Sequence, residues 1–182
     1  MGRASTKENK NVYQQRREEL GLTREAASEL LEGLSQEKIE RIENERTLPQ
    51  PDEVLIMAEG YKEPELCNYY CSNECPIGRK YVPEVKIRDL SQIILEMLAS
   101  LNTVQKKQEQ LIEIAADGAI DRNEIPDFVQ IQEDLEKISI TVETLQLWSE
   151  KMLANGSIDR DAYEAYMSER GQSSNALTGL SL

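Results

Sequence analysis

The residues best suited to recognition chemistry lie close together in one short segment of the chain. The segment 35–45 includes Gln36, Glu37, Lys38 and Arg41, side chains that can hydrogen-bond to a flat polar edge. Glutamine can pair with the edge of adenine, and lysine or arginine with the edge of guanine. Glutamate can accept a hydrogen bond from the amino group of cytosine, although phosphates repel it. We therefore interpret this segment as a reader of base edges in DNA.

Two short helices are needed to position this segment. Thr23 and Ser35 are expected N-caps, because their side-chain oxygens can satisfy free amides at a helix start. Gly33 lies where the first helix must stop and where the backbone can need a positive φ. Apolar residues predicted to hold the two helices together are Leu30, Leu31, Leu34, Ile39 and Ile42. Two short helices joined by a turn that contains glycine are typical of a domain that places its second helix, here 35–45, in the major groove.

Residues 12–60 resemble the Cro/repressor-type helix-turn-helix family, the xenobiotic-response-element class of bacterial and phage regulators. The resemblance rests on Arg17–Thr23 at the end of a first helix, Thr23–Ala27 in the second, Ile39–Asn44 in the third, and a further helix after Pro49. It implies an ion pair between Arg17 and Glu43 that ties the first helix to the recognition helix. The resemblance predicts a sequence-specific DNA-binding transcriptional regulator.

The same resemblance suggests which residues hold phosphates. Arg24 stands where the family usually has a glutamine that contacts a phosphate, and we expect Asn44 and Arg46 to hold the following phosphate. The chain departs from the family pattern in two further places: the turn has Glu32 as an extra residue, and Glu45 replaces a frequent glycine. Carboxylates near the recognition helix favour an alternative, a protein-interaction adaptor that keeps the fold without binding DNA.

Charge is unevenly distributed along the 182 residues, whose formal net charge is −13. Residues 1–83 carry 12 Lys+Arg against 16 Asp+Glu, and residues 84–182 carry 9 against 18. The acidic excess argues against indiscriminate binding of nucleic acid, which depends on cationic side chains. Residues 1–10 are predicted to be a flexible basic arm, which can contact phosphates or a minor groove or remain a solvated tail.

The composition gives no sign of catalysis. Histidine is absent, which removes the commonest general base and metal ligand, and no nucleophile elbow, phosphate loop or dinucleotide motif is present. We predict no enzyme activity, catalytic residue, cofactor or metal. Three cysteines, no apolar run long enough to cross a bilayer and no signal-peptide core predict a cytoplasmic protein.

Two weaker patterns leave alternatives open. Cys67, Cys71 and Cys75 form a C-x3-C-x3-C series, which we interpret as small buried hydrophobes rather than a metal site. The turns 116–121 and 154–159 partly match a calcium-binding loop. Both turns are better explained by a glycine that ends one helix, followed by an aspartate that caps the next. Asp121 with Glu124 is similar to a capping box.

The predicted architecture is all-α. A five-helix domain over 11–83 ends near Pro83, a long antiparallel helical hairpin of coiled-coil type occupies 84–170, a short third helix lies near 162–166, and a disordered tail covers 171–182. Two heptad series of mainly apolar residues are expected to form the hairpin seam: Ile87, Leu90, Ile94, Met97, Leu101, Val104, Gln108, Leu111 and Ala115, and Phe128, Ile131, Leu135, Ile138, Val142, Leu145, Ser149 and Met152. Each series predicts a helix of about 40 Å.

A second apolar stripe lies off this seam and includes Ile93, Ile140, Leu147 and Trp148. A two-helix hairpin cannot cover it alone. We therefore expect a homodimer formed mainly by residues 84–167, with double-stranded DNA as the other partner and no membrane contact. In the alternative, the stripe packs on the first domain and the chain is a compact monomer.

Overall fold

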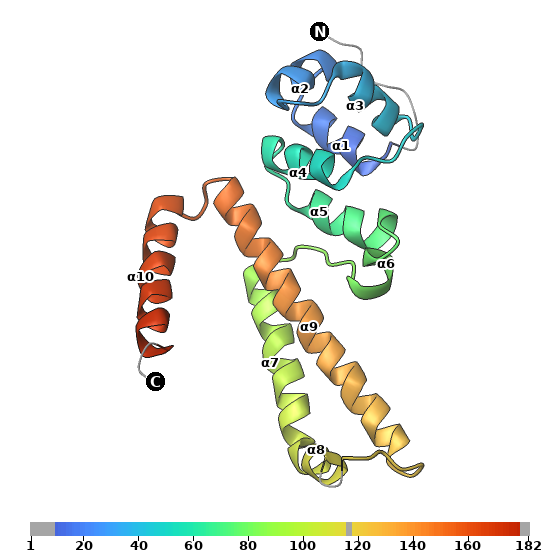
Figure 1. Cartoon of the computed structure of the whole chain (residues 1–182), viewed down its shortest axis with the longest axis vertical. Coiled ribbons are helices and arrows are strands. Elements are labelled where there is room, and N and C mark those ends of the chain that lie inside the picture. The colour runs from blue at the N-terminus through green and yellow to red at the C-terminus, as the bar shows by residue number, and fades with distance from the viewer. Residues whose placement is uncertain (1–9, 116–117, 179–182) are drawn as a thin grey trace. The chain divides into compact units, whose positions relative to one another are not determined.

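The computed structural model describes residues 10–115 and 118–178, and all regular structure in these ranges is helical (Figure 1). The all-α prediction is therefore confirmed. Except for Lys10, the predicted basic arm lies outside the described residues, as do the last four residues of the predicted tail. No helix in the described ranges has both the length and the apolar character needed to span a bilayer.

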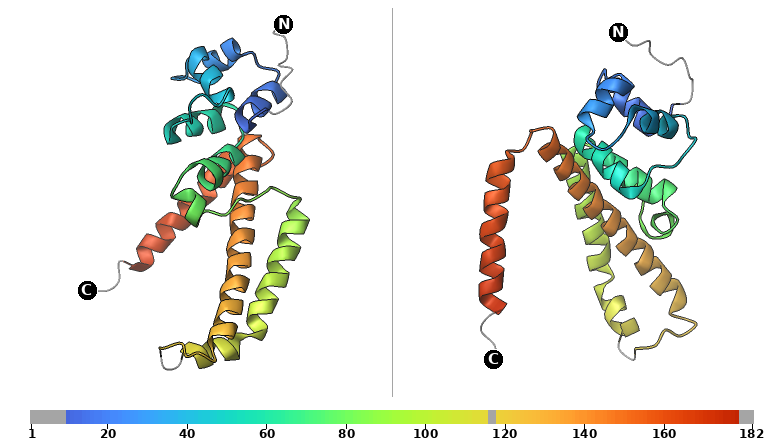
Figure 2. Two further views of the ribbon diagram at one scale, coloured as in Figure 1. Left: turned by 90° about the vertical axis from the view of Figure 1, so that its right-hand side faces the viewer. Right: turned by 45° about the horizontal axis from the view of Figure 1, so that its top comes forward.

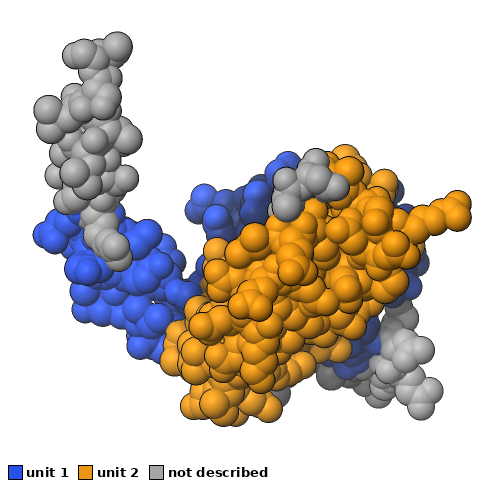
Figure 3. All heavy atoms as spheres, turned by 90° about the horizontal axis from the view of Figure 1, so that it is seen from below, with its two compact units in different colours: residues 1–66, 149–182 blue, residues 67–148 orange. Residues whose placement is uncertain are grey.

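The chain divides into two compact units, residues 1–66 with 149–182, and residues 67–148 (Figure 3). This division differs from a boundary at Pro83. Residues 67–83 join the second unit partly because the Asn68 side chain donates to the carbonyl of Pro83 at 3.1 Å and accepts from the amide of Val85 at 3.0 Å.

Five helices begin the chain: α1 (Val12–Glu19), α2 (Arg24–Leu30), α3 (Gln36–Glu43), α4 (Pro51–Gly60) and α5 (Glu65–Tyr69) (Figure 1). The predicted caps are present. Thr23 accepts a hydrogen bond from the amide of Ala26 at 3.1 Å, and Ser35 accepts one from the amide of Lys38 at 3.2 Å. Gly33 has φ +103°, the left-handed conformation expected at this turn.

The helix-turn-helix core consists of fully or nearly fully buried side chains, including Tyr13, Ala27, Leu31, Leu34, Ile39, Ile42, Val54, Met57 and Tyr61. Leu30 was wrongly placed in this core, since it is 48% exposed. The reason is angular: Ala27 and Leu31 are four residues apart and share a helix face, whereas Leu30 is rotated by about 100° from Leu31.

The second unit begins within α5 and continues through a π-helical turn, η1 (Tyr70–Glu74), and then α6 (Gly78–Tyr81). These two turns pack tightly. A Cβ on Gly78 would lie 2.1 Å from the carbonyl oxygen of Cys71, so only glycine fits there. The cysteines were expected to be buried, but Cys67, Cys71 and Cys75 are half-buried and form no disulfide. No cluster that could hold a metal is found within the described ranges.

The hairpin is built from α7 (Leu90–Lys106), α8 (Gln108–Ala115) and α9 (Ile125–Ala154) (Figure 2). Its first arm is broken, contrary to the prediction of one continuous helix. The break lies at Lys107, where a tightened turn joins its amide to the carbonyl of Val104 at 3.0 Å. The Lys107 ammonium binds Asp134 of α9 at 2.6 Å.

The seam of the hairpin is rotated by about one residue from the predicted one. Ile131 of the predicted seam is buried, but so are Ile93 and Leu147, which were expected to lie off it. Other residues of the predicted seam are 38–47% exposed: Leu90, Ile94, Leu101, Leu135 and Val142. On α9 the buried positions include Asp134, Thr141 and Thr144.

The polar residues can lie at the seam because their polar groups are satisfied. Thr141 donates to the carbonyl of Ile138 at 2.8 Å and Thr144 to that of Ile140 at 2.7 Å, within their own helix. A prediction that counts only apolar residues misses such positions.

The last helix, α10 (Arg160–Thr178), is much longer than predicted and continues through residues 171–178, where we expected disorder. Extending an existing helix costs far less than starting one, and the single Gly171 does not stop it. The turn before α10 has the predicted form, since Asp159 accepts from the amide of Ala162 at 3.0 Å and Gly156 has φ +77°. Asp121 and Glu124 form the predicted capping box, at 2.9 and 3.1 Å.

The hairpin should lose stability in acid through Asp134. Lys107 and then Lys137 lower the pKa of this carboxyl. A carboxyl with a lowered folded pKa contributes stability that is complete above its unfolded value of about 4 and disappears as pH falls through the folded pKa. Asp134→Asn should therefore be less stable than the parent at pH 7 and equally stable at the lowest pH. Urea unfolding at pH 7, 4 and 3 measures this, and a difference that grows on acidification would contradict it.

Candidate nucleic-acid interface

A buried ion cluster fixes the recognition helix α3 against α1 and α2. The carboxylate of Glu43 is 1% exposed and accepts from Arg17 Nε at 2.5 Å and Nη2 at 3.0 Å. Arg17 also donates to the carbonyl of Leu22 at 2.5 Å. The hydrogen bond that Arg17 donates to Glu43 raises the pKa of Arg17, so this contact favours the charged guanidinium. The predicted ion pair is confirmed.

Arg24 joins this cluster, which the sequence analysis did not foresee. Its Nε donates to the second carboxylate oxygen of Glu43 at 2.7 Å, while 29% of its side chain stays exposed. Glu43 therefore holds two guanidinium groups from two helices. The contact orients the Arg24 side chain at the start of α2, where we predicted a phosphate contact.

The predicted base-reading residues occupy one exposed region of α3. Gln36, Glu37 and Arg41 are exposed, and α3 buries Ile39, Ile42 and Glu43 on its other side. Lys38 differs from the other three, because its ammonium binds Glu53 of α4 at 2.9 Å and its side chain is 29% exposed. Gln36, Glu37 and Arg41 thus extend into solvent, and Lys38 must leave Glu53 to reach a base.

The residues predicted to hold the following phosphate lie at the C-terminal end of α3. Asn44 is the half-buried C-cap. The side chain of Arg46 is 67% exposed and lies 3.9 Å from a carboxylate oxygen of Glu40. The long separation and the exposure make this a weak ion pair, so Arg46 is available to another anion.

Asn11 is a positioning residue that the sequence analysis missed. Its side-chain oxygen caps α1 by accepting from the amide of Gln14 at 3.0 Å, and its Nδ2 donates to the carbonyl of Ile42 in α3 at 2.8 Å. One side chain thereby joins the start of α1 to the recognition helix. The cap was recognisable from an asparagine before a helix, whereas the contact with α3 depends on the tertiary fold.

Glu45 follows α3 in the left-handed conformation, with φ +57°. The amides of Glu45 and Arg46 bond to the carbonyls of Ile42 and Arg41 at 2.9 and 2.8 Å, the hydrogen-bond pattern of a Schellman motif, which favours glycine at this position. The left-handed backbone at this position therefore explains why the family pattern has glycine where this chain has Glu45.

Glu45→Gly should raise the free energy of unfolding by about 0.5–1 kcal/mol, because a side chain in this conformation is strained. Lys62→Gly is the matched control, since Lys62 ends α4 in the same motif with φ +52°. Both variants should be more stable in urea, and only Glu45→Gly should strengthen DNA binding, by removing a carboxylate beside the phosphates. Loss of stability in both would refute the strain argument.

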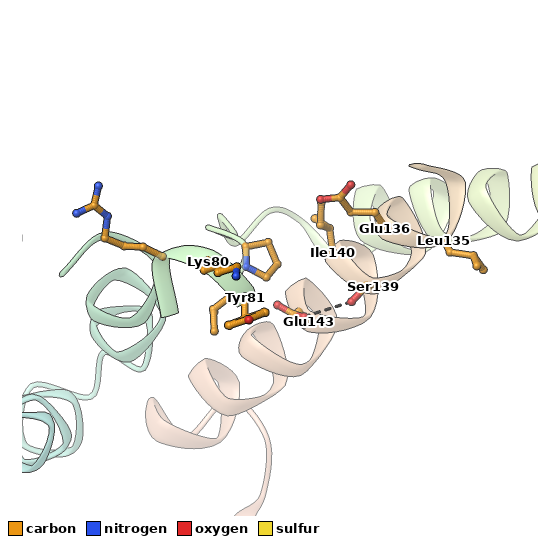
Figure 4. A pocket seen from close by; sticks show the side chains of 10 residues that line it. Lys80, Tyr81, Leu135, Glu136, Ser139, Ile140 and Glu143 are labelled. Atoms are coloured by element: carbon orange, nitrogen blue, oxygen red, sulfur yellow. Dashed lines mark hydrogen bonds between the residues drawn. The ribbon is translucent and has the colours of Figure 1, made fainter. Parts of the chain in front are cut away.

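A cavity of about 480 Å³ lies in the second unit between residues 79–83 and α9 (Figure 4). Its lining combines the cations Arg79 and Lys80 with the carboxylates Glu136 and Glu143. Lys80 lies over the ring of Tyr81, 5.1 Å from its centroid. This mixture of charges matches no single ligand class, and we assign it none.

The comparisons with known proteins bear on the first unit. Residues 14–66 match a family model described as a helix-turn-helix domain. The match spans α2 and α3, nearly all of α1, and α4 through the start of α5. The comparisons with curated proteins and with solved structures found no match.

Proposed function

Because residues 14–66 form a helix-turn-helix domain, we propose that the chain is a sequence-specific, DNA-binding transcriptional regulator of bacterial or phage type. The observation that carries this proposal is the exposed row Gln36, Glu37 and Arg41 on a helix whose opposite side is anchored by Arg17 and Glu43. A rigid helix with exposed polar side chains can enter the major groove and keep a fixed register.

In the proposed complex, phosphate and base contacts come from different residues. Arg24, Asn44 and Arg46 hold phosphates on either side of the groove, and these contacts set the position of α3. Gln36, Glu37, Lys38 and Arg41 face base edges. The protein acts by binding rather than by catalysis, and it acts in the cytoplasm.

Selected-site enrichment with the full-length protein tests this proposal. Purified chain is incubated with random double-stranded DNA at low salt, and bound DNA is amplified through several rounds. We expect one motif to emerge that a variant with Arg41→Ala and Gln36→Ala does not enrich. Failure to recover any motif would rule out sequence-specific binding.

The second candidate function is the adaptor without DNA affinity, favoured by the exposed carboxylates Glu37 and Glu45 and by the acidic chain. Retention on heparin and on nonspecific DNA separates the two. A DNA-binding protein elutes with a steep dependence on salt because counterions are released on binding. An adaptor passes through even at low salt.

We further propose that the chain acts as a homodimer. Reading two half-sites needs two recognition helices held about one DNA turn apart. The residues expected to form the contact must be revised, since Ile93 and Leu147 are buried within the chain. The exposed apolar residues Ile94, Leu101, Leu135 and Val142 take their place. Sedimentation of the full-length chain at micromolar concentration tests this, and a monomer would eliminate the dimer.

A further inference from the structure

The cysteines are the sequence motif that the proposed function leaves unused. The chain's three cysteines all lie within the described residues; Cys67, Cys71 and Cys75 are half-buried, and none is in a disulfide. Thiols that solvent can partly reach are able to react, whereas fully buried ones are inert. In the cytoplasm proposed above, where thiols are kept reduced, a neighbouring pair of thiols more often senses oxidation than stabilises a fold.

A π-helical turn brings Cys71 and Cys75 together. At the end of η1 the amide of Cys75 bonds to the carbonyl of Tyr70, five residues back, at 2.9 Å. Such a turn is wider than an α-helical one and rises less per residue, so residues four apart lie closer than the ~6 Å of an α-helix. A disulfide needs Cα atoms roughly 4.4–6.8 Å apart. The spacing of Cys71 and Cys75 therefore suits a bridge.

Gly78, at the start of α6, contacts both of these cysteines. Its amide donates to Sγ of Cys75 at 3.5 Å. A Cβ on Gly78 would lie 2.1 Å from the carbonyl oxygen of Cys71 and 2.9 Å from its Cα, so this close approach needs a residue without a side chain. One residue thus packs against Cys71 and orients the sulfur of Cys75.

The phenol of Tyr70 lies near both sulfur atoms. Burial, and then the charges of Cys75, Glu74 and Cys71, raise the pKa of the Tyr70 hydroxyl. Effects of a single neighbouring charge act over a few ångströms. Since the charged forms of both thiols act on the same hydroxyl, the two sulfur atoms lie on the same side of η1.

The two thiols have different surroundings, which sets an order of reaction. Burial, and then the charge of Cys75, raise the pKa of the Cys71 thiol. The thiolate is the form that attacks an oxidant, so Cys71 is a slow first nucleophile. This order makes Cys75 the attacking thiol and Cys71 the resolving thiol.

We propose that Cys71 and Cys75 are a redox-active pair that a hydroperoxide converts reversibly into a disulfide. The thiolate of Cys75 attacks the terminal oxygen of the hydroperoxide, the O–O bond breaks, and the departing oxygen takes up the thiol proton and leaves as an alcohol or water. The sulfenic acid on Cys75 is then attacked by the sulfur of Cys71, which forms the S–S bond and releases the sulfenic oxygen as water. The two sulfurs are oxidised, and the peroxide is reduced by two electrons.

The bridge is suited to repeated opening and closing. Both cysteines are half-buried, and disulfides that solvent can reach are the readily reduced, regulatory ones. A small thiol reopens the bridge by exchange. The pair lies outside the matched residues 14–66, so the inference does not depend on DNA binding.

Peptide mapping of the full-length protein after oxidation tests the pair. The reduced chain is treated with hydrogen peroxide at low molar excess, the remaining thiols are blocked with iodoacetamide, and the denatured chain is digested. Cleavage after Glu74 separates Cys71 from Cys75, and cleavage after the preceding tyrosines separates Cys71 from Cys67. We expect two peptides joined through Cys71 and Cys75, which dithiothreitol separates.

Serine variants test the order of the two thiols. Cys71→Ser should leave Cys75 as a sulfenic acid that dimedone labels, because no resolving thiol remains. Cys75→Ser should give about 10-fold less label on Cys71, since burial keeps Cys71 in its thiol form. The matched control Cys67→Ser should form the bridge at the parental rate.

The other outcomes overturn the proposal in distinguishable ways. A bridge from Cys67 to either of the other cysteines would reject the assigned pair. A disulfide between two chains, without one inside a chain, would show that the sulfurs of Cys71 and Cys75 do not meet. Survival of all thiols in peroxide, with the chain still folded by circular dichroism, would reject redox activity. Equal dimedone labelling of Cys71→Ser and Cys75→Ser would reject the assigned order.

Discussion

Glu43→Ala is expected to lower the free energy of unfolding of the helix-turn-helix domain by about 3–5 kcal/mol, the usual cost of removing one partner of a buried ion pair. The carboxylate is 1% exposed and binds two guanidinium groups, those of Arg17 and Arg24. Only 7% of the Arg17 side chain is exposed, so the substitution leaves a cation that water cannot reach. The helix α3 would lose the ionic contacts that join it to α1 and to α2.

Urea unfolding of the full chain, followed by circular dichroism, measures this loss. Glu40→Ala is the matched control, because it removes a partly exposed carboxylate from the same helix and should cost less than about 0.5 kcal/mol. The double variant Arg17→Met with Glu43→Leu should recover much of the loss, since it removes the buried charge of Arg17 and leaves only the partly exposed Arg24 without its partner. Equal costs for Glu43→Ala and Glu40→Ala would mean that the cluster contributes little.

The second large effect is expected in DNA binding. Arg41→Ala should reduce discrimination at one base pair by about 1–3 kcal/mol, because the exposed Arg41 is placed to pair with a guanine edge. Arg24→Ala should weaken binding to every DNA sequence about equally. It should also lower the slope of log affinity against log salt concentration by about one, as expected for a single phosphate contact.

Titration of the enriched motif and its single-base variants, at several salt concentrations, separates the two residues. Arg24 also binds Glu43 at 2.7 Å, so the folded fraction of Arg24→Ala is measured first. The control Arg79→Ala removes an exposed cation outside the helix-turn-helix domain. It should change neither the discrimination between base pairs nor the salt slope of DNA binding. If Arg41→Ala and Arg24→Ala weaken all sequences to the same extent, Arg41 does not read a base.

Features that depend on neighbours a few residues away were predictable from the sequence alone. Thr23 and Ser35 cap helices, and Asp121 with Glu124 forms a capping box; each of these side chains satisfies a backbone amide within about one helical turn. Gly33 adopts the left-handed conformation that its own turn requires. The five-helix order and the hairpin follow from helical periodicity. The contact between Arg17 and Glu43, 26 residues apart, was predictable only because the family resemblance supplied it.

Tertiary structure decided which side of each helix is buried. The predicted seam followed the apolar residues Leu135 and Val142, but the fold buries their neighbours Asp134 and Thr141, whose polar groups are satisfied by Lys107 and by the helix backbone. A residue's own type cannot show that its hydrogen bonds will be made by a lysine 27 positions away. Likewise, the residue type of Arg24 suggests only a phosphate contact. The packing of α2 against α3 is what brings its side chain to Glu43.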